Sequence, residues 1–378
     1  MDAKKLCFVV NDLHFFVTHR LDLALKLSQE HKIHLVCSKD NATSEDLEII
    51  SNHKMIATHH LPSRDKGKFA NGYISYFSLL KRIIDAIKPN YILFVTLEIS
   101  LIGALIHYFN NSRKSIFLIT GLGPFFNESS FKYKLIKYIQ KKAFSFLKHT
   151  KNYIFIFQNP DDQKTFIELG FINQSSSILI KGNGINLKNF SYRKRAFDKK
   201  LVFLFASRLV KSKGVNEFIR SASIIKKKYS TAEFLIAGKY NNLDPDTIGD
   251  SEYKNLLSNK SLKYLGDLHY EKMEECFHQS SIFVMPSYGE GLPKVALEAA
   301  ATGMPLIMSD VQGCRECVLN NVNGFLFNPK DPDDLLKTIE TCILNNNQLI
   351  KFGENSSKMI EDNFSLEVIY KEYQKLLK

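Results

Sequence analysis

The chain has 378 residues, more than one hydrophobic core normally supports, so two domains are expected. Apolar residues make up 44% of it and charged residues 24%, which excludes an intrinsically disordered protein. The formal net charge of +12 indicates an anionic partner. Nucleic acid, an anionic membrane and a phosphorylated substrate all remain open at this point.

The six cysteines are scattered along the chain, and the single CxxC motif, Cys314 with Cys317, has no second ligand pair at zinc spacing. We therefore expect buried free thiols in a reducing cytosol. The first apolar run is too short for a signal peptide, and no run approaches the roughly 18 apolar residues of a membrane span. The sequence predicts a cytoplasmic protein, which can still bind peripherally to a membrane surface.

Short apolar runs without polar alternation recur in the N-terminal half, and helical patterns separate them. Such runs are typical of parallel strands that helices cover on both faces. Strand and helix in alternation predict an α/β fold. The predicted strands of this half are 4–10, 32–38, 90–96, 114–120, 152–159 and 176–183.

After residue 189 the chain becomes polar and basic over Phe190 to Lys200, which predicts a linker. A second series of apolar runs follows, at 201–208, 232–239, 262–267, 281–287, 304–310 and 324–328. The sequence therefore predicts two α/β domains in tandem, residues 1–190 and 191–363. The amphipathic segment 364–378 predicts a last helix, which can pack back on the first domain.

Two glutamates, Glu290 and Glu298, lie eight residues apart on either side of a predicted helix start. Glycines flank Glu290, Pro293 suits a first helical turn, and Gly303 is placed to end the helix. A helix N-terminus attracts anions. With a diphosphate bound there, the two carboxylates can accept hydrogen bonds from sugar hydroxyls. The alternative interpretation is two surface glutamates on an ordinary strand–helix unit.

A basic loop, ASRLVKSKG, follows the first predicted strand of the second domain and contains Arg208, Lys211 and Lys213. The carboxyl ends of strands are where α/β domains bind ligands. Arg208 and Lys213 can therefore clamp a diphosphate and stabilise the charge that develops as a sugar–phosphate bond breaks. The alternative is a solvated basic loop without a ligand.

Arg208 and Lys213, together with the E-x7-E pair Glu290 and Glu298, resemble the donor site of family 4 retaining glycosyltransferases, which use nucleotide-sugars. The resemblance implies the GT-B fold, two Rossmann-like domains facing each other across a cleft. It covers essentially the whole chain and is strongest from 201 to 327. The family generally needs no metal, so no cofactor is expected.

Three segments, TGLGPFF (120–126), KGNGINLKNF (181–190) and SDVQGCRECV (309–318), are similar to one branch of this family. That branch includes bacterial undecaprenyl-diphosphate-sugar α-1,3-N-acetylgalactosaminyltransferases. The resemblance implies transfer of a hexose or N-acetylhexosamine, with GalNAc favoured, from a UDP-sugar to an undecaprenyl-diphosphate-linked sugar. The expected setting is surface polysaccharide or glycan assembly, such as O-antigen or capsule, at the inner face of the bacterial plasma membrane.

The same resemblance implies roles for individual residues. Arg208 and Lys213 would bind the donor diphosphate, and the backbone of 291–293 would line the sugar pocket. Glu298 would bind the ribose and Glu290 the donor sugar. Arg208, Lys213 and Glu290 are therefore the expected catalytic residues. The full set of expected donor-site residues is Arg208, Lys213, Gly238, Glu290, Gly291, Leu292, Pro293 and Glu298.

On the acceptor side the sequence departs from the family. The loop NDLHFFVTHR lacks the glycine pair of many relatives, and Glu98 stands where they often carry a basic or His-containing motif. His19 and Arg20 open a predicted helix after the first strand, where Arg20 can hold an acceptor phosphate and His19 an acceptor hydroxyl. The glycines Gly121 and Gly123 can open space for the acceptor, although a tight structural turn explains them equally well.

Residues 129–160 contain seven lysines and no acidic residue. Within them, the segment around 131–148 mixes lysines with aromatic residues, which is typical of a helix on an anionic membrane surface. No nucleic-acid-binding motif accompanies these lysines, so no nucleic-acid partner is expected. The acidic runs at 244–246 and 331–334 have Pro inside them, and Asp331 or Asp333 is better explained as a helix cap than as a metal ligand.

Two other functions remain open from the sequence. A UDP-sugar epimerase or a phosphorylase on the same fold would change the reaction and keep the donor site. A membrane-associated sugar-binding subunit would keep the fold without turnover.

Overall fold

The computed structural model describes residues 3–62, 69–109, 112–122, 131–197 and 200–378; at 69–73, 131–136 and 139 it describes the backbone alone. Contacts divide the chain into two compact units. Unit 1 comprises Met1–Gly184 and Ile369–Lys378, and unit 2 comprises Ile185–Val368. The basic segment Phe190 to Lys200 thus belongs to unit 2, where Phe190 is buried in the core.

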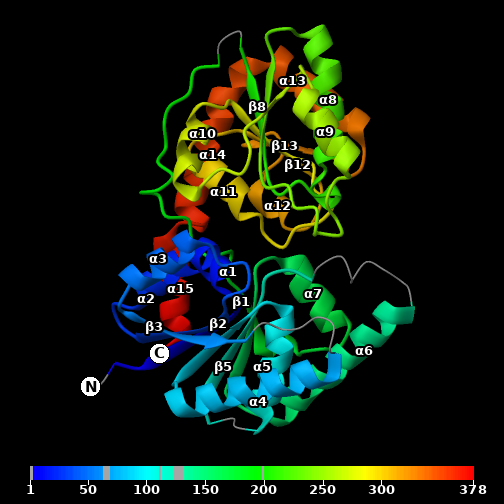
Figure 1. Ribbon diagram of the computed structural model, residues 1–378. Helices are drawn as coiled ribbons and strands as arrows, with labels where there is room; N and C mark the ends of the chain where they lie inside the picture. The colour runs from blue at the N-terminus through cyan, green and yellow to red at the C-terminus, as the bar shows by residue number, and fades with distance from the viewer. Residues whose placement is uncertain (1–2, 63–68, 110–111, 123–130, 198–199) are drawn as a thin grey trace. The chain divides into compact units, whose positions relative to one another are not determined.

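Unit 1 is built on a seven-stranded parallel sheet in the order β3-β2-β1-β4-β5-β6-β7. Its central strands are apolar on both faces because helices cover both faces, as Figure 1 shows. The strands are β1 (Lys5–Asp12), β2 (Lys32–Ser38), β3 (Ile56–Leu61), β4 (Tyr91–Val95), β5 (Lys114–Ile119), β6 (Tyr153–Phe157) and β7 (Ser177–Leu179).

The core of unit 1 is rich in aromatic residues, since Phe117 and Phe155 of neighbouring strands pack with Phe144 and Phe166 of the covering helices. The helices are α1 (Leu13–His19), α2 (Leu21–Leu27), α3 (Ser44–Asn52), α4 (Phe69–Ile87), α5 (Leu97–Phe109), α6 (Phe131–Ser145), η2 (Phe146–His149), α7 (Pro160–Glu168) and η3 (Gln174–Ser176).

The C-terminal segment also belongs to unit 1. In α15 (Leu366–Leu376), Tyr370 donates a hydrogen bond to Glu30 at 2.8 Å. Lys114 at the start of β5 donates to the carbonyl of Leu376 at 2.5 Å, and the hydroxyl of Tyr91 donates to that of Lys378. The chain end is thereby attached to the N-terminal edge of the first sheet.

Unit 2 is built on a six-stranded parallel sheet in the order β10-β9-β8-β11-β12-β13. Two βαβαβ halves diverge from its centre, which is the Rossmann arrangement. The strands are β8 (Val202–Ala206), β9 (Glu233–Ala237), β10 (Lys263–Tyr264), β11 (Ile282–Met285), β12 (Leu306–Ser309) and β13 (Gly324–Phe327).

The helices of unit 2 cover both faces of this sheet, and two separate apolar clusters form the two layers of its core. They are η4 (Lys211–Lys213), α8 (Val215–Lys228), α9 (Asp250–Ser258), α10 (Tyr270–His278), α11 (Lys294–Ala301), α12 (Cys314–Cys317), α13 (Pro332–Leu344), η5 (Asn346–Gln348) and α14 (Leu349–Asn363).

The predicted α/β fold is confirmed, because both sheets are parallel and helices cover them. The expected helix after Glu290 begins at Lys294, with Pro293 as its N-cap, and ends before Gly303. Asp331 caps α13 as expected, by accepting from two backbone N–H groups. The sequence analysis missed β3, an edge strand whose inner residues Ala57 to His60 are only partly buried.

The cysteines are buried free thiols, as predicted. No helix in the described ranges combines the length and the apolar character that crossing a membrane would require.

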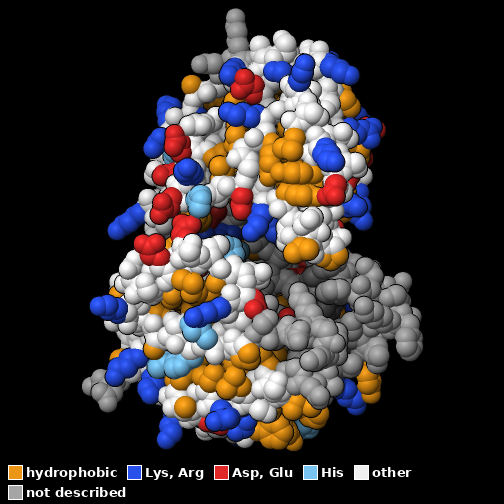
Figure 2. Space-filling model, in the orientation of Figure 1, with side chains coloured by type: hydrophobic (Ala, Val, Ile, Leu, Met, Phe, Trp, Pro, Cys, Tyr) orange, Lys and Arg blue, Asp and Glu red, His pale blue; other side chains and the backbone are white. Residues whose placement is uncertain are grey.

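Figure 2 shows lysine and arginine side chains spread over the visible face instead of gathered into one patch.

Candidate active site

The carboxyl ends of β8 and β11 meet at the centre of the second sheet, where the strand order reverses. Such a switch point is where open α/β sheets bind ligands. The loop after β8 carries Arg208 and Lys213, and the loop after β11 carries Glu290. The structure thus brings together residues that lie about eighty positions apart in the sequence.

Lys213 and Glu290 form an ion pair, with 2.5 Å between Nζ and Oε1. Both side chains are mostly buried, 19% and 10% exposed. Gly214 follows Lys213 with φ of +72°, and a Cβ at this position would collide with the carbonyl of Pro286. Glycine is therefore required where the two loops pass each other, and Lys213 can reach Glu290.

Further hydrogen bonds tie the same two loops together. The backbone N–H of Tyr288 donates to the carbonyl of Ser212 at 2.8 Å, and the hydroxyl of Ser287 donates to the same carbonyl at 3.2 Å. The hydroxyl and the backbone N–H of Ser212 both donate to Asp246. Tyr288 donates from its hydroxyl to Glu217 of α8. Lys213 and Glu290 thus lie on loops that are fixed independently of their own ion pair.

Arg208 is paired with Asp244, at 2.8 Å between Nη1 and Oδ2. Its side chain is 65% exposed, in contrast to that of Lys213. Asp244 lies on the segment after β9, and its Oδ1 accepts from the backbone N–H of Asp246. The DPD run therefore contacts the basic loop at two points. Asp244 pairs with Arg208, and Asp246 accepts hydrogen bonds from Ser212.

Glu298 lies in the second turn of α11 and is 5% exposed. Its Oε1 pairs with Lys294 one turn earlier at 2.6 Å, and Lys294 also donates to the hydroxyl of Tyr270 at 3.1 Å. Burial lowers the pKa of Lys294, but the neighbouring Glu298 and Tyr270 outweigh it and hold that pKa above its usual value. Glu298 therefore faces a permanently charged ammonium group.

The other predicted donor residues lie on the same edge. Gly238 directly follows β9 with φ of +151°, and a Cβ there would collide with the carbonyl of Ser207, at the start of the basic loop. A Cβ on Gly313 would collide with the carbonyls of Glu290 and Gly291. The predicted donor residues 291–293 connect Glu290 to the start of α11, where Pro293 is the N-cap.

The buried thiol of Cys314 lies near this edge as well. Burial, and after it the charge of Glu290, raises the pKa of Cys314 well above its usual value. The thiol therefore stays protonated and acts as apolar packing under the Glu290 loop.

Sequence reasoning missed the partners of these residues: Asp244, Asp246, Lys294 and Tyr288. The DPD run was noticed, but its contact with Arg208 spans 36 positions and has no local signal. The i,i+4 spacing of Lys294 and Glu298 on one helix was a readable signal.

In unit 1 the corresponding switch point lies between β1 and β4. There Thr96 donates from its hydroxyl to the side-chain carbonyl of Asn11 at 3.1 Å. Thr96 has φ of +82°, an uncommon conformation for a β-branched residue. The first unit thus carries neutral polar groups at the position where the second carries charged pairs.

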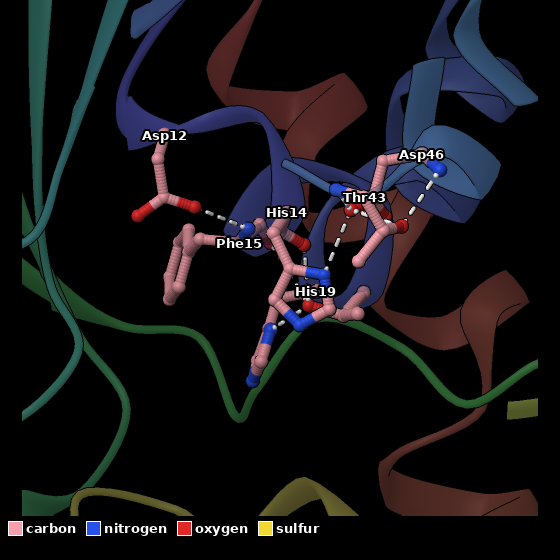
Figure 3. A network of polar contacts seen from close by, with 7 residues as sticks. Asp12, His14, Phe15, His19, Thr43 and Asp46 are labelled. Atoms are coloured by element: carbon pink, nitrogen blue, oxygen red, sulfur yellow. Dashed lines mark hydrogen bonds and ion pairs between the residues drawn. The ribbon is translucent and has the colours of Figure 1, made fainter. Parts of the chain in front are cut away.

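Three of the predicted acceptor residues, His19, Arg20 and Gly121, lie in the described part of unit 1. His19 ends α1, with its Nδ1 2.7 Å from the hydroxyl of Thr18 and its ring stacked on Phe15 (Figure 3). Gly121 follows β5 with φ of +149°, and Gly123 lies outside the described residues.

Arg20 is 1% exposed, beside Tyr373 of α15. Burial lowers the pKa of its guanidinium to about 10, although Tyr373 raises it in part. This burial is at odds with the predicted role, because an acceptor phosphate cannot reach the guanidinium in this arrangement. The covering helix lies more than 340 positions away in the sequence, which is why the position looked exposed.

Among the described residues, no group of three or more His, Cys, Asp or Glu side chains is placed to hold a metal ion.

Comparisons with known proteins agree with this architecture. Residues 5–150 match the family described as "Glycosyl transferase 4-like", and residues 188–359 match "Glycosyl transferases group 1". The class is the two-domain GT-B glycosyltransferases. The chain thus combines a 4-like and a group 1 glycosyltransferase domain, and it is a transferase enzyme.

Two relatives and one solved structure illustrate the similarity. The N,N'-diacetylbacillosaminyl-diphospho-undecaprenol alpha-1,3-N-acetylgalactosaminyltransferase of Campylobacter jejuni is 29% identical, over 69% of this chain and 70% of that protein. The UDP-Gal:alpha-D-GlcNAc-diphosphoundecaprenol alpha-1,3-galactosyltransferase of Escherichia coli is 32% identical, over 28% of this chain and 31% of that protein. Anabaena HepE, solved with UDP and glucose, has a TM-score of 0.78 at 16% identity and covers 99% of both chains.

Proposed function

We propose that this glycosyltransferase moves a hexose or an N-acetylhexosamine, most simply GalNAc, from a UDP-sugar to a lipid-diphosphate-linked sugar with retention of configuration. The contact between Lys213 and Glu290 at the switch point of unit 2 carries this proposal. A cation for a leaving diphosphate and a carboxylate for a sugar hydroxyl meet at the edge where α/β sheets bind ligands.

In this scheme, Arg208 and Lys213 change partners when the donor binds. Arg208 and Lys213 are paired with Asp244 and Glu290, so an incoming diphosphate takes over the two cations. Glu290 is then free to accept a hydrogen bond from the transferred sugar, and Glu298 accepts one from the ribose. The N-terminus of α11, which follows Gly291, Leu292 and Pro293, adds partial positive charge.

The reaction needs charge stabilisation more than a protein nucleophile. As the sugar–phosphate bond breaks, negative charge grows on the departing UDP, and Lys213 and Arg208 neutralise it. The acceptor oxygen bonds to the anomeric carbon on the face that UDP leaves. Its proton passes to the departing phosphate oxygen, so no carboxylate nucleophile is required. Two side-chain cations supply the positive charge in this scheme without a metal.

The names of the relatives support the acceptor. The C. jejuni and E. coli proteins are both named for sugars on diphospho-undecaprenol. For this chain we therefore propose an undecaprenyl-diphosphate-linked sugar and a place in bacterial glycan assembly, at the inner face of the plasma membrane.

A membrane-facing surface of unit 1 fits this acceptor. Exposed aromatic side chains gather at the ends of α5, α6 and η2, with Tyr108 in ring contact with both Phe109 and Phe146. Lys142 lies 5.7 Å from the ring of Tyr138 on α6. Phe144 and Leu147, in contrast, are buried in the core, so part of the predicted 131–148 segment packs inward. Aromatic rings with flanking lysines suit an anionic interface.

The test of the reaction is UDP-sugar binding and hydrolysis by the purified protein with EDTA present. UDP-GalNAc, UDP-GlcNAc, UDP-Gal, UDP-Glc and GDP-Man are compared. Tight UDP binding with slow, selective hydrolysis of one UDP-sugar is expected. Activity with GDP-Man alone, or activity abolished by EDTA and restored by Mg²⁺, would overturn the donor or the metal-free scheme. Release of free UDP that the acceptor accelerates would exclude an epimerase.

The membrane surface is tested by sedimentation with phosphatidylglycerol vesicles. Replacing Phe109 and Phe146 together by Ser should reduce the bound fraction several-fold, since each ring buries apolar area in the interface. Leu344→Ser is the matched control, an exposed apolar residue of unit 2. Equal binding by both variants would contradict the assignment.

A further inference from the structure

His14 and Asp46 form a pair at the C-terminal edge of the first sheet. His14 lies in the first turn of α1, directly after β1, and Asp46 lies in the first turn of α3, after β2. Because β1 and β2 are neighbours, the two turns meet, with 3.0 Å between Nδ1 of His14 and Oδ2 of Asp46. Figure 3 shows the imidazole ring directed to this carboxylate.

The carboxylate of Asp46 is fixed without His14. Its Oδ2 accepts from the backbone N–H of Thr43 at 2.8 Å and from the Thr43 hydroxyl at 2.9 Å. The backbone N–H of Asp46 donates in return to Thr43, which completes a capping box at the start of α3. The Asp46 side chain is only 5% exposed. The imidazole of His14 therefore contacts a carboxylate that other hydrogen bonds already hold in place.

This partner decides the tautomer of His14. A carboxylate only accepts hydrogen bonds, so Nδ1 of a neutral His14 carries the hydrogen and Nε2 carries a lone pair. The His14 side chain is 48% exposed. The pair thus presents a fixed hydrogen-bond acceptor on the surface of unit 1, in the arrangement that orients a histidine toward a hydroxyl.

The Nε2 lone pair of the tautomer described above accepts from an O–H donor, whereas a phosphate oxygen without hydrogen has nothing to donate to it. Arg20 and His19, the two residues that the sequence suggested for this edge, have other contacts. Arg20 is buried beside Tyr373, and His19 contacts Thr18 and Phe15. The exposed, oriented imidazole of α1 in the described structure is His14.

We propose that His14, oriented by Asp46, accepts a hydrogen bond from a hydroxyl of the acceptor sugar. The inference rests on the proposed function and deepens it, by assigning a neutral sugar hydroxyl to this edge of unit 1. Asp46 is a positioning residue, because it acts through His14.

Three variants separate the atoms involved. His14→Asn retains a polar group near Nδ1 and loses the acceptor at Nε2. His14→Gln places an amide oxygen near the Nε2 position. Asp46→Asn with its amide oxygen in the place of Oδ2 keeps the bonds from Thr43 and replaces the charged acceptor of Nδ1–H by a weaker neutral one. The control is His59→Asn, on β3 of the same unit, whose ring is paired with that of His34.

The measurement is the KM for a water-soluble polyprenyl-diphosphate-linked N-acetylglucosamine, beside UDP affinity and UDP-sugar hydrolysis. We expect His14→Asn and Asp46→Asn to raise this KM about three- to tenfold, the range of one hydrogen bond. UDP affinity and hydrolysis should stay unchanged, and His14→Gln should recover part of the loss. Nitrogen-15 shifts of His14 should report hydrogen on Nδ1 in the wild type and a mixture of the two tautomers in Asp46→Asn, whose acceptor is weaker.

Several outcomes would overturn the inference. An unchanged KM in His14→Asn, or a wild-type ring with its hydrogen on Nε2, would do so. So would a loss of affinity in His14→Asn for the polyprenyl diphosphate without its sugar, because the ligand would then be the phosphate. Absence of any UDP-sugar turnover or UDP binding in the wild type would instead refute the proposed function itself.

Discussion

The two sheets of this glycosyltransferase share one strand order around their switch points, yet the edges differ in chemistry. In unit 2 the edge carries paired charges, Lys213 with Glu290 and Arg208 with Asp244. In unit 1 it carries neutral groups, Thr96 with Asn11, and beside them His14 held by Asp46. The topology fixes where a ligand binds, and the side chains decide whether it is an anion or a hydroxyl.

The backbone reflects the same difference. Unit 2 uses glycine where the backbone must pass closely, at Gly214 and Gly238. In unit 1, Thr96 adopts positive φ in the loop after β4, the strand that corresponds to β11. A β-branched residue in that conformation costs of the order of 1–3 kcal/mol, so the surrounding structure must hold it there.

Removing Lys213 should give the largest effect on the charged edge. We expect Lys213→Ala to lower kcat by about 10²–10³, the loss found when one group that stabilises a transition-state charge is removed. Affinity for the UDP-sugar donor should fall much less, because the charge on the diphosphate grows only as the sugar–phosphate bond breaks. Steady-state kinetics and calorimetry with the UDP-sugar in the absence of acceptor measure the two quantities.

The matched control for Lys213 is Lys211→Ala, an exposed lysine of the same short helix. It should leave kcat within a factor of two or so, as expected for a surface charge. Equal losses of turnover and of UDP-sugar affinity in Lys213→Ala would count against a leaving-group role.

Replacing Glu298 should mainly affect nucleotide binding. Glu298→Gln removes a charged acceptor, and we expect UDP affinity to fall about 10- to 100-fold, in line with hydrogen bonds to charged groups. Part of this loss reflects Lys294, a buried amine that loses the carboxylate that helps to hold its pKa up. The ribose assignment is therefore tested separately, with 2′-deoxy-UDP.

In the wild type, 2′-deoxy-UDP should bind more weakly than UDP. In Glu298→Gln this difference should shrink, because the variant has lost the partner of the ribose hydroxyl. An undiminished preference for UDP would show that Glu298 acts on another part of the nucleotide.

The sequence predicted the fold because the relevant signals are local. Apolar runs mark the buried strands, and Pro293 and Gly303 bracket α11. It missed β3, which lies at the edge and is partly exposed, so its pattern is mixed. On the charged edge the residue types and their spacing left a surface alternative open, and the resemblance to family 4 glycosyltransferases selected Arg208, Lys213, Glu290 and Glu298, whose roles stay predictions.

The contacts of these residues could not be predicted in the same way. Lys213 and Glu290 are 77 positions apart, and their ion pair depends on two strands being neighbours. The link between His14 and Asp46 spans 32 positions for the same reason. Arg20 looked exposed in its own segment, and only the return of α15 to unit 1 buries it.

The smallest effect is expected at the exposed end of the charged edge. Arg208 is mostly solvated, and an exposed ion pair contributes about 0–1 kcal/mol. Asp244→Asn frees Arg208 from a competing carboxylate, so UDP should bind up to about fivefold more tightly, and less so at high salt. Calorimetry at low and high ionic strength measures this. A marked weakening would mean that Asp244 positions Arg208 for the diphosphate, as Asp46 is proposed to position His14. Asp244 would then not be a competing partner that the ligand displaces, which is the role proposed for Glu290 at Lys213.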